Sequence, residues 1–141
     1  MTPILLDSSA IVALLDRRDH AHSACMQVMR EIRQPLFTCE AVISESWFLL
    51  RAIRGAGEDV VANVARGNFE LRFELKKSVI AVLALMHKYR DVPMSLADAC
   101  LVQMADELDT GDILTLDSDF QHYRWRKNKR FNLLIPLGRE R

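Results

Sequence analysis

The chain has 141 residues, of which 50% are hydrophobic, and its 19 basic and 19 acidic residues give a formal net charge of zero. This length suffices for one domain with a substantial core, and this hydrophobic content excludes a mainly disordered chain. No apolar run approaches the ~18 residues of a membrane-spanning helix, and the start MTPILLD lacks the basic and long apolar regions of a signal peptide. We therefore expect a single domain over residues 1–141 that does not interact with membranes.

The cysteines indicate the redox environment of the chain. Cys25, Cys39 and Cys100 are odd in number, widely separated and form no C-x-x-C pair. This pattern argues against a disulfide framework and against a thiolate zinc site. A reducing environment, and hence a cytoplasmic location, is the expectation.

Basic residues are concentrated at the C-terminal end. Residues 124–141 hold seven basic side chains against one acidic side chain, Glu140, so this segment carries +6 and residues 1–123 carry −6. A basic segment indicates a phosphate-rich partner. It is equally typical of a solvated, disordered tail, and the charge pattern alone leaves both interpretations open.

The first half of the chain predicts two strands, each followed by a pair of helices. In chain order these elements are Pro3–Asp7, Ser9–Arg17, Ala21–Arg33, Leu36–Thr38, Ser44–Arg54 and Asp59–Arg66. Pro3–Asp7 is a continuous apolar run with a polar end, as in a buried strand. In Ala21–Arg33 the apolar residues recur with the period of an amphipathic helix, and Pro35 ends that helix.

The second half continues the alternation of strands and helices. Its elements are, in order, Phe69–Leu75, Val79–Tyr89, Ser95–Leu108, Ile113–Asp117 and Asn132–Leu137. Phe69–Leu75 alternates apolar and polar residues with a period of two, and Pro136 suits an edge strand. Strands that alternate with helices of about ten residues favour βαβ units. The predicted fold class is α/β, a three-layer α/β/α sandwich with a mostly parallel central sheet.

Four acids fall at positions that such a sheet would bring together. Ligands gather at the carboxyl ends of parallel strands, and Asp7 and Asp117 end the first and fourth predicted strands. Glu45 and Asp98 each begin the apolar stripe of a helix, so each should point toward the buried side of that helix. All four carboxylates should therefore approach one edge of the sheet, with Asp119 two residues beyond Asp117.

Each acid taken alone also fits a structural role. Asp98 has the spacing of a capping box with Ser95, and Glu45 suits the helix dipole. Asp117 and Asp119 suit a turn or an N-cap. As a group, however, these acids replace apolar residues on inward faces, and such a cluster repels itself unless a cation neutralises it. Oxygen ligands alone select hard ions, so Mg²⁺ or Mn²⁺ is predicted, and these ions support phosphodiester hydrolysis.

Other chemistries find less support in the sequence. The four histidines are scattered, and there is no glycine-rich phosphate loop. A phosphoacceptor receiver domain would need adjacent acids near the first strand and a lysine after a late strand. A phosphatase or dehalogenase would need the pattern D-x-D, whereas Asp7 is followed by Ser8 and Ser9.

Four short segments, DSSAIVALL, SESWFLL, SLADACLVQMA and TLDSDF, follow one another in this order. In order and context they resemble the PIN domain family, most closely its VapC-like toxin ribonucleases from bacterial toxin–antitoxin pairs. The resemblance extends from Asp7 to about Tyr123. It implies a parallel sheet flanked by helices, a Mg²⁺ or Mn²⁺ cofactor, and endonucleolytic cleavage of RNA.

The resemblance also implies roles for single residues. The acids that the family uses for metal binding and catalysis match Asp7, Glu45, Asp98 and Asp117. Asp119 matches a further catalytic acid whose role varies more, and Ser9 and Thr115 match polar residues that orient carboxylates or water. Toxins of this kind are usually held inactive by a small antitoxin and usually dimerise, so a cognate antitoxin and a homodimer are expected.

Cations near an acidic pocket would have to bind the RNA phosphates. The candidates follow Glu45 on its helix or follow the segment TLDSDF, and they are Arg51, Arg54, Arg124, Arg126 and Lys127. Tyr123 or Trp125 could stack on an unpaired base, although packing against the sheet is the favoured role for Trp125. The apolar run Trp47–Leu50 nearly surrounds its helix, which suggests a surface for a dimer or an antitoxin.

The sequence therefore predicts a Mg²⁺-dependent endoribonuclease, the toxin of a toxin–antitoxin pair. Two alternatives stay open at this point. One is an inactive PIN-like module that binds RNA or protein without cutting, and the other, less favoured, is a receiver-like regulatory domain.

Overall fold

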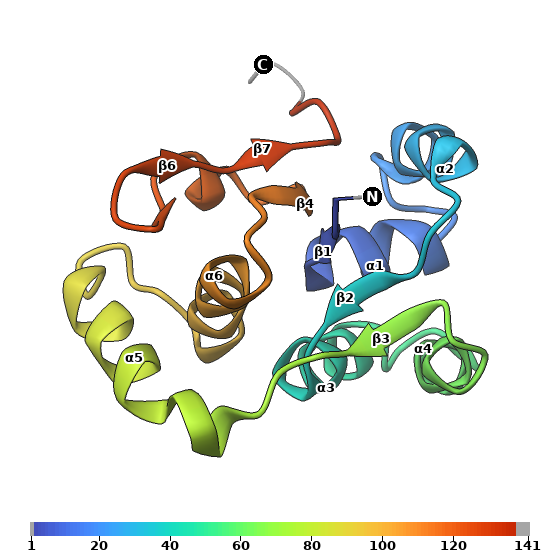
Figure 1. The fold of residues 1–141 in the computed structure, drawn as a ribbon. Helices are drawn as coiled ribbons and strands as arrows, with labels where there is room; N and C mark the ends of the chain where they lie inside the picture. Colours follow the sequence, from blue (N-terminus) through green and yellow to red (C-terminus); the bar gives the residue numbers. More distant parts are fainter. Residues whose placement is uncertain (1, 138–141) are drawn as a thin grey trace.

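The structure, a computed structural model, describes residues 2–137 and has a five-stranded sheet at its centre (Figure 1). The strands are, in chain order, β1 (Leu5–Leu6), β2 (Leu36–Thr38), β3 (Phe69–Leu71), β4 (Asp112–Leu114) and β7 (Asn132–Leu133). They lie in the order β3-β2-β1-β4-β7, and each neighbouring pair is parallel. β1 is therefore the central strand.

Six α-helices within the described residues flank this sheet (Figure 1). They are α1 (Ser8–Leu15), α2 (His22–Glu31), α3 (Glu40–Leu49), α4 (Ala56–Ala65), α5 (Leu75–Lys88) and α6 (Leu96–Leu108). α1 packs against α2, α3 and α4, whereas α6 packs against α3 and α5. The predicted α/β fold, with helices on a mostly parallel central sheet, is confirmed.

The two central strands are short and completely buried. Leu5 and Leu6 in β1, and Ile113 and Leu114 in β4, have no exposed surface. They stand in register, with Leu5 opposite Ile113 and Leu6 opposite Leu114. A parallel strand covered on both faces needs apolar residues at every position, which explains why these strands appear in the sequence as continuous apolar runs.

Two predicted strands are shorter than expected. The third strand ends at Leu71, because its partner β2 ends at Thr38 opposite it and Leu75 already begins α5. The fourth strand ends at Leu114 rather than Asp117. Backbone pairing, which ends where the neighbouring strand ends, sets these limits, and the side-chain pattern of one segment does not reveal them.

The helix after the second strand also begins earlier than expected. α3 starts at Glu40, four residues before the predicted Ser44, because Cys39 is the extended N-cap that follows β2 directly. It ends at Leu49, and the following turn reaches Gly55, whose φ of 79° lies in the left-handed region that suits glycine. Glu45 consequently lies in the second turn of α3, not the first.

The basic C-terminal segment is part of the fold as far as residue 137. Strands β5 (Arg124–Trp125) and β6 (Lys129–Arg130) form an antiparallel hairpin, and β7 then pairs with β4 at the edge of the sheet. Trp125 is buried, and its Nε1 donates a hydrogen bond to the carbonyl of Arg130 over 3.1 Å. The disordered-tail interpretation is wrong for residues 124–137, and base stacking by Trp125 is wrong as well. Residues 138–141 lie outside the described residues.

Two further findings concern the environment of the chain. The three cysteines are free and buried. Over residues 2–137, the structure has no helix that combines the length and the apolar character needed to cross a membrane.

We expect Gly111→Ala to destabilise the protein by about 1–3 kcal/mol. A Cβ at this position would overlap the indole of Trp125, and that indole anchors the β5–β6 hairpin. Urea denaturation followed by tryptophan fluorescence measures the change. In a Trp125→Phe background the smaller ring leaves more room, so the same substitution should cost less. An equal loss in both backgrounds would contradict this packing.

Candidate active site

Asp7 lies between the central strand and the helix that follows it. It is the extended N-cap of α1, is 3% exposed, and its Oδ1 accepts a hydrogen bond from the Ser8 amide over 2.8 Å. Its Oδ2 accepts hydrogen bonds from Thr115 Oγ1 over 2.7 Å and from Ser9 Oγ over 2.9 Å. Three neutral donors therefore fix the orientation of this carboxylate without neutralising its charge.

The hydroxyl groups of Ser9 and Thr115 also tie α1 to the segment after β4. Ser9 Oγ accepts from the Leu116 amide over 2.9 Å, and Thr115 Oγ1 accepts from the Asp117 amide over 3.0 Å. The two hydroxyl oxygens lie 3.2 Å apart. The structure thus brings both predicted polar residues into direct contact with Asp7 or its neighbours.

Asp117 and Asp119 begin a short 3₁₀ helix, η1 (Ser118–Gln121). Asp117 is its N-cap, and its Oδ1 accepts from the Asp119 amide over 2.9 Å. The capping role that the sequence allowed for Asp117 is therefore confirmed. Asp117 can still bind another group, because a carboxylate has further lone pairs that the capping hydrogen bond does not use.

Asp98 lies in the first turn of α6 and is 8% exposed. Its backbone amide donates to Ser95 Oγ over 3.0 Å, so Ser95 caps the helix as the sequence suggested. The carboxylate of Asp98 accepts at Oδ2 from the hydroxyl of Tyr123 over 2.9 Å. The side chain of Asp98 therefore contacts the segment after η1.

Three of the predicted acids form a compact group. One carboxylate oxygen from each of Asp98, Asp117 and Asp119 lies within 4.8 Å of the others. Asp7 and Glu45 lie outside this group, yet both interact electrostatically with Asp117. In the sequence, Asp119 matches an acid whose role varies more than that of the other four acids. In the structure, Asp119 is a member of this group, whereas Asp7 and Glu45 are not.

Burial and repulsion by neighbouring carboxylates raise the pKa values of Asp7, Glu45 and Asp98. Desolvation, with Asp7 as the next cause, raises the pKa of Asp98 to about 7. Burial also raises the pKa of Asp7, against the hydrogen bonds from Thr115 and Ser9. Desolvation and the charge of Asp7 raise the pKa of Glu45. The surroundings of these three carboxyl groups therefore disfavour their charged forms, as expected where carboxylates are buried close together.

The chemistry of the donors fits a divalent cation. Over residues 2–137, no Lys, Arg or His side chain forms an ion pair with any of the five acids. All the available ligand atoms are carboxylate or hydroxyl oxygens, which Mg²⁺ and Mn²⁺ prefer. Asp98, Asp117 and Asp119 are the residues that would hold such an ion.

The sequence missed the position of Tyr123. The sequence allows Tyr123 to stack on a base, but the side chain has no exposed surface and its hydroxyl donates a hydrogen bond to Asp98. Base stacking by Tyr123 is therefore wrong. The only sequence signal is the spacing of Phe120 and Tyr123 after Asp119, which is as typical of ordinary core residues.

The predicted phosphate-binding cations have structural contacts of their own. Arg124 donates through one guanidinium nitrogen to the carbonyls at the end of η1, at residues 121, 122 and 123. Arg126 pairs with Asp109 over 3.1 Å, and Arg126 and Lys127 form the hairpin loop with φ values of 43° and 71°. The guanidinium of Arg51 lies 3.8 Å from the centre of the Phe48 ring.

Arg54 is exposed and lines a hollow with Arg17 and Arg18. None of the five cations bonds to one of the clustered acids among the described residues. Phosphate binding by Arg51, Arg54, Arg124, Arg126 and Lys127 stays a prediction.

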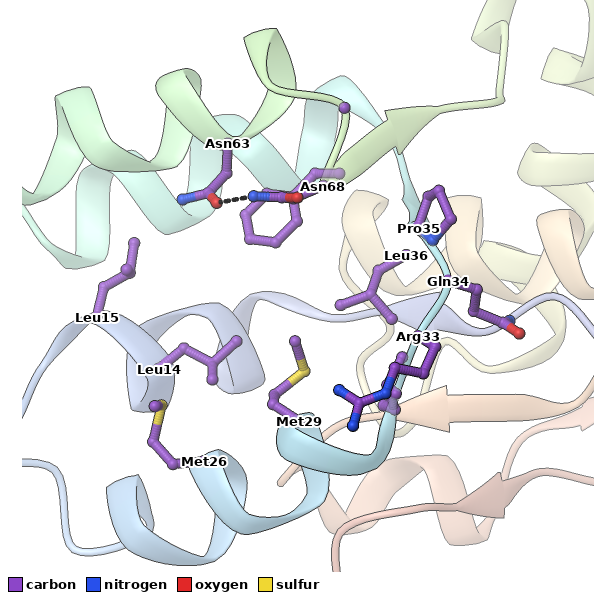
Figure 2. A pocket seen from close by; sticks show the side chains of 13 residues that line it. Leu14, Leu15, Met26, Met29, Arg33, Gln34, Pro35, Leu36, Asn63 and Asn68 are labelled. Carbon is purple, nitrogen blue, oxygen red and sulfur yellow. Dashed lines mark hydrogen bonds between the residues drawn. The ribbon is translucent and has the colours of Figure 1, made fainter.

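A separate apolar hollow of about 620 Å³ lies away from the acids (Figure 2). Leu14 and Leu15 of α1 face Met26 and Met29 of α2 across it, and a hydrogen bond of 2.9 Å joins Asn63 to Asn68 at its rim. None of the five acids lines this hollow. Its lining fits an apolar partner rather than a charged substrate.

A parallel α/β sheet with carboxylates clustered at its carboxyl edge is the arrangement that defines PIN domains. The PIN domain model matches residues 4–126, and the chain belongs to this family. Among relatives, it is 26% identical over 137 residues to Ribonuclease VapC26 of Mycobacterium tuberculosis (strain ATCC 25618 / H37Rv), and the match covers 96% of this chain and 94% of that protein.

A solved structure agrees with this fold. The crystal structure of Mycobacterium tuberculosis VapC20, described as a sarcin–ricin loop cleaving toxin, is similar with a TM-score of 0.77 and 17% identity. The match covers 84% of this chain and 93% of that chain. The resemblance to VapC-like PIN domains is confirmed, and the receiver-like alternative is wrong.

Without metal, the protein should lose stability as the pH rises from about 5 to 8. The pKa of Asp98 is about 7 in the folded protein and has its usual value of 3.8 in the unfolded chain. Between these values the folded state binds more protons, so raising the pH destabilises it. We expect a loss on the order of 2 kcal/mol in EDTA, less than the full shift implies because solvent screens part of the site.

Asp98→Asn provides the test of this pH dependence. It should weaken the dependence and make the metal-free protein more stable than wild type at pH 8, because the amide keeps the shape without the charge. Asp59→Asn, at an exposed acid in the first turn of α4, should leave the dependence unchanged. Urea denaturation at both pH values measures all three proteins, and identical pH dependence in wild type and Asp98→Asn would refute the assignment.

Proposed function

We propose that the chain is a metal-dependent endoribonuclease that hydrolyses RNA phosphodiester bonds and acts as the toxin of a toxin–antitoxin pair. The observation that carries the proposal is the group of three carboxylates within 4.8 Å that no cationic side chain neutralises within the described residues. The relative VapC26 is named a ribonuclease and the structural neighbour VapC20 is described as a sarcin–ricin loop cleaving toxin, which supports the same activity.

The acids of such a site have different roles. Asp98, Asp117 and Asp119 hold the cation, and Asp7 is the fixed acid beside them, oriented by Ser9 and Thr115. When bound, Mg²⁺ or Mn²⁺ lowers the pKa of a water molecule and stabilises the charge that develops on the phosphoryl oxygens.

Glu45 is the acid best suited to proton transfer. It is partly exposed and its pKa is raised by desolvation and by Asp7, so it exchanges protons nearer to neutral pH than an ordinary glutamate does. Its position in the second turn of α3 keeps it at the margin of the acid group. We assign it the proton-handling role and not primary metal binding.

Purified protein should cut total cellular RNA into discrete fragments in Mg²⁺ and leave it intact in EDTA. Asp98→Asn and Asp7→Asn should each lower the rate at least about 10- to 100-fold, because Asp98 is a proposed ligand of the cation and Asp7 is a proposed support of the ligand group beside it. End-mapping of the fragments on a sequencing gel measures both rate and cleavage position.

The control for this assay is again Asp59→Asn, which changes an exposed acid outside the site and should cut like wild type. The protein must be shown by mass spectrometry to carry no bound inhibitor. Intact RNA in every lane would favour the inactive module that binds RNA without cutting. Wild-type cleavage rates in both Asp98→Asn and Asp7→Asn would contradict the assignment of these acids to the active site.

The proposal includes a homodimer. Large apolar side chains are exposed on two helices that both pack against α6, with Trp47, Phe48 and Leu49 on α3 and Val79, Ile80 and Leu83 on α5. Ile80 is 77% exposed and Phe48 is 54% exposed. An apolar surface of this kind is unfavourable in water and is typical of a surface that another chain covers.

Ile80→Glu should convert this dimer to a monomer. The glutamate carboxylate would lose its hydration in the apolar interface, which destabilises the dimer. The dissociation constant should therefore rise at least about 100-fold. Sedimentation velocity over a range of concentrations measures it. Val61→Glu is the matched control, because Val61 is 52% exposed on α4, outside the proposed interface helices. A wild-type protein that stays monomeric at high concentration would contradict the proposal.

A small antitoxin is the second partner that we propose, acting in the cytoplasm where RNA is found. Such a protein needs an apolar surface, and the hollow in Figure 2 offers one that none of the five acids lines. Co-expression with a candidate antitoxin, a small protein encoded beside this chain, followed by size-exclusion chromatography and the RNA assay, tests for a complex that is inactive. Separate elution of two proteins with undiminished cleavage would contradict this pairing.

A further inference from the structure

Tyr123 occupies a position between two of the clustered acids. Its hydroxyl donates to Asp98 Oδ2 over 2.9 Å, and its backbone amide donates to the carbonyl of Asp119 over 3.2 Å. The residue is completely buried. It therefore connects the first turn of α6 with η1 from the inside of the protein.

Two aromatic contacts fix the ring of Tyr123, and a third supports one of its neighbours. It meets Tyr89 edge-on, with ring centres 5.0 Å apart, and Phe120 edge-on at 5.1 Å. Phe120 is held in turn by Phe131 at 5.4 Å. Because edge-to-face packing restricts the ring, the position of the Tyr123 hydroxyl is set by the fold and not by the metal site.

The chemistry of a tyrosine hydroxyl suits this position. A carboxylate otherwise rotates about its terminal bond with little restriction, and one hydrogen bond on one oxygen removes that freedom. A lysine or arginine would also hold Asp98, but it would cancel the charge that attracts a cation. A phenol orients the carboxylate and leaves its charge intact.

We propose that Tyr123 is a positioning residue whose hydroxyl holds the Asp98 carboxylate toward Asp117 and Asp119, and thereby sets the affinity of the site for a divalent cation. This inference rests on the proposed function, since it requires a cation at these acids. Tyr123 touches neither the cation nor the RNA. Groups that orient a metal ligand typically account for about 10- to 100-fold in metal affinity.

The direct test is Mn²⁺ binding to purified protein, measured by calorimetry, for wild type, Tyr123→Phe and Tyr89→Phe. The two variants lose one hydroxyl from the same aromatic cluster, but the Tyr89 hydroxyl accepts from the Arg124 amide and does not donate to an acid of the site. We expect Tyr123→Phe to weaken Mn²⁺ binding at least about 10-fold and Tyr89→Phe to leave it unchanged.

A stability measurement separates positioning from a purely structural role. Melting temperatures are taken in EDTA and at a fixed Mn²⁺ concentration, and the rise caused by Mn²⁺ is compared. If Tyr123 has only a structural role, its substitution lowers the melting temperature equally in EDTA and in Mn²⁺. The rise in melting temperature caused by Mn²⁺ then stays the same. We expect a smaller rise for Tyr123→Phe alone, and an undiminished rise would overturn the inference.

The failure of the inference can be told from the failure of the proposed function. If the wild-type protein binds no Mn²⁺, both the proposed metal site and the proposed role of Tyr123 are contradicted. If wild type binds Mn²⁺, Asp98→Asn does not, and Tyr123→Phe equals wild type, only the role of Tyr123 falls.

A measurement on the wild-type protein avoids dependence on the folding of Tyr123→Phe. The chain contains two tyrosines, Tyr89 and Tyr123, so ¹³C-tyrosine labelling gives two ring signals, which the spectrum of Tyr89→Phe assigns. Mg²⁺ should shift the ¹³Cζ resonance of Tyr123 as its acceptor changes, and should leave that of Tyr89 in place. Saturation of the site with Mg²⁺ without a shift at Tyr123 would overturn the inference.

Discussion

Repulsion between carboxylates at the carboxyl edge of the sheet is the constraint to which the surrounding structure is adapted. Desolvation and like charge raise the pKa values of Asp7, Glu45 and Asp98 together. Such an arrangement costs folding free energy at neutral pH unless a cation is bound. The rigid apolar strands beneath it, with Leu5 and Ile113 completely buried, supply the stability that keeps these acids together.

Within residues 2–137, the groups that hold these acids are neutral. Hydroxyls from Ser9, Thr115 and Tyr123, together with backbone amides, perform the task that arginine or lysine performs in an ordinary ion pair. Each such bond fixes a carboxylate and preserves its charge. The basic residues that follow close by in sequence, Arg124 and Arg126, are instead engaged with carbonyl groups and with Asp109. Orientation and charge are thus controlled by different sets of residues.

Much of this arrangement could be predicted from the sequence, because it follows from local patterns. The apolar runs identified the central strands, and acids on inward-facing positions indicated the candidate site. The role of Tyr123 could not be predicted, since a tyrosine near an acid in sequence does not reveal a bond to Asp98, which lies 25 residues away. The hairpin at Trp125 depends on its fit over Gly111, and the end of the third strand depends on where β2 ends. Such features arise from contacts between distant segments, which residue type and spacing do not encode.

The order of the residues along the chain has a consequence for synthesis of the protein. Asp98, Asp117 and Asp119 all come from the last third of the chain, and the edge strand β7, which pairs with β4 beside them, comes last of all. A ribosome that makes this chain therefore carries an incomplete site until translation has passed β7. For the nuclease that we propose, the nascent polypeptide would be harmless to the messenger and to the ribosome that produce it.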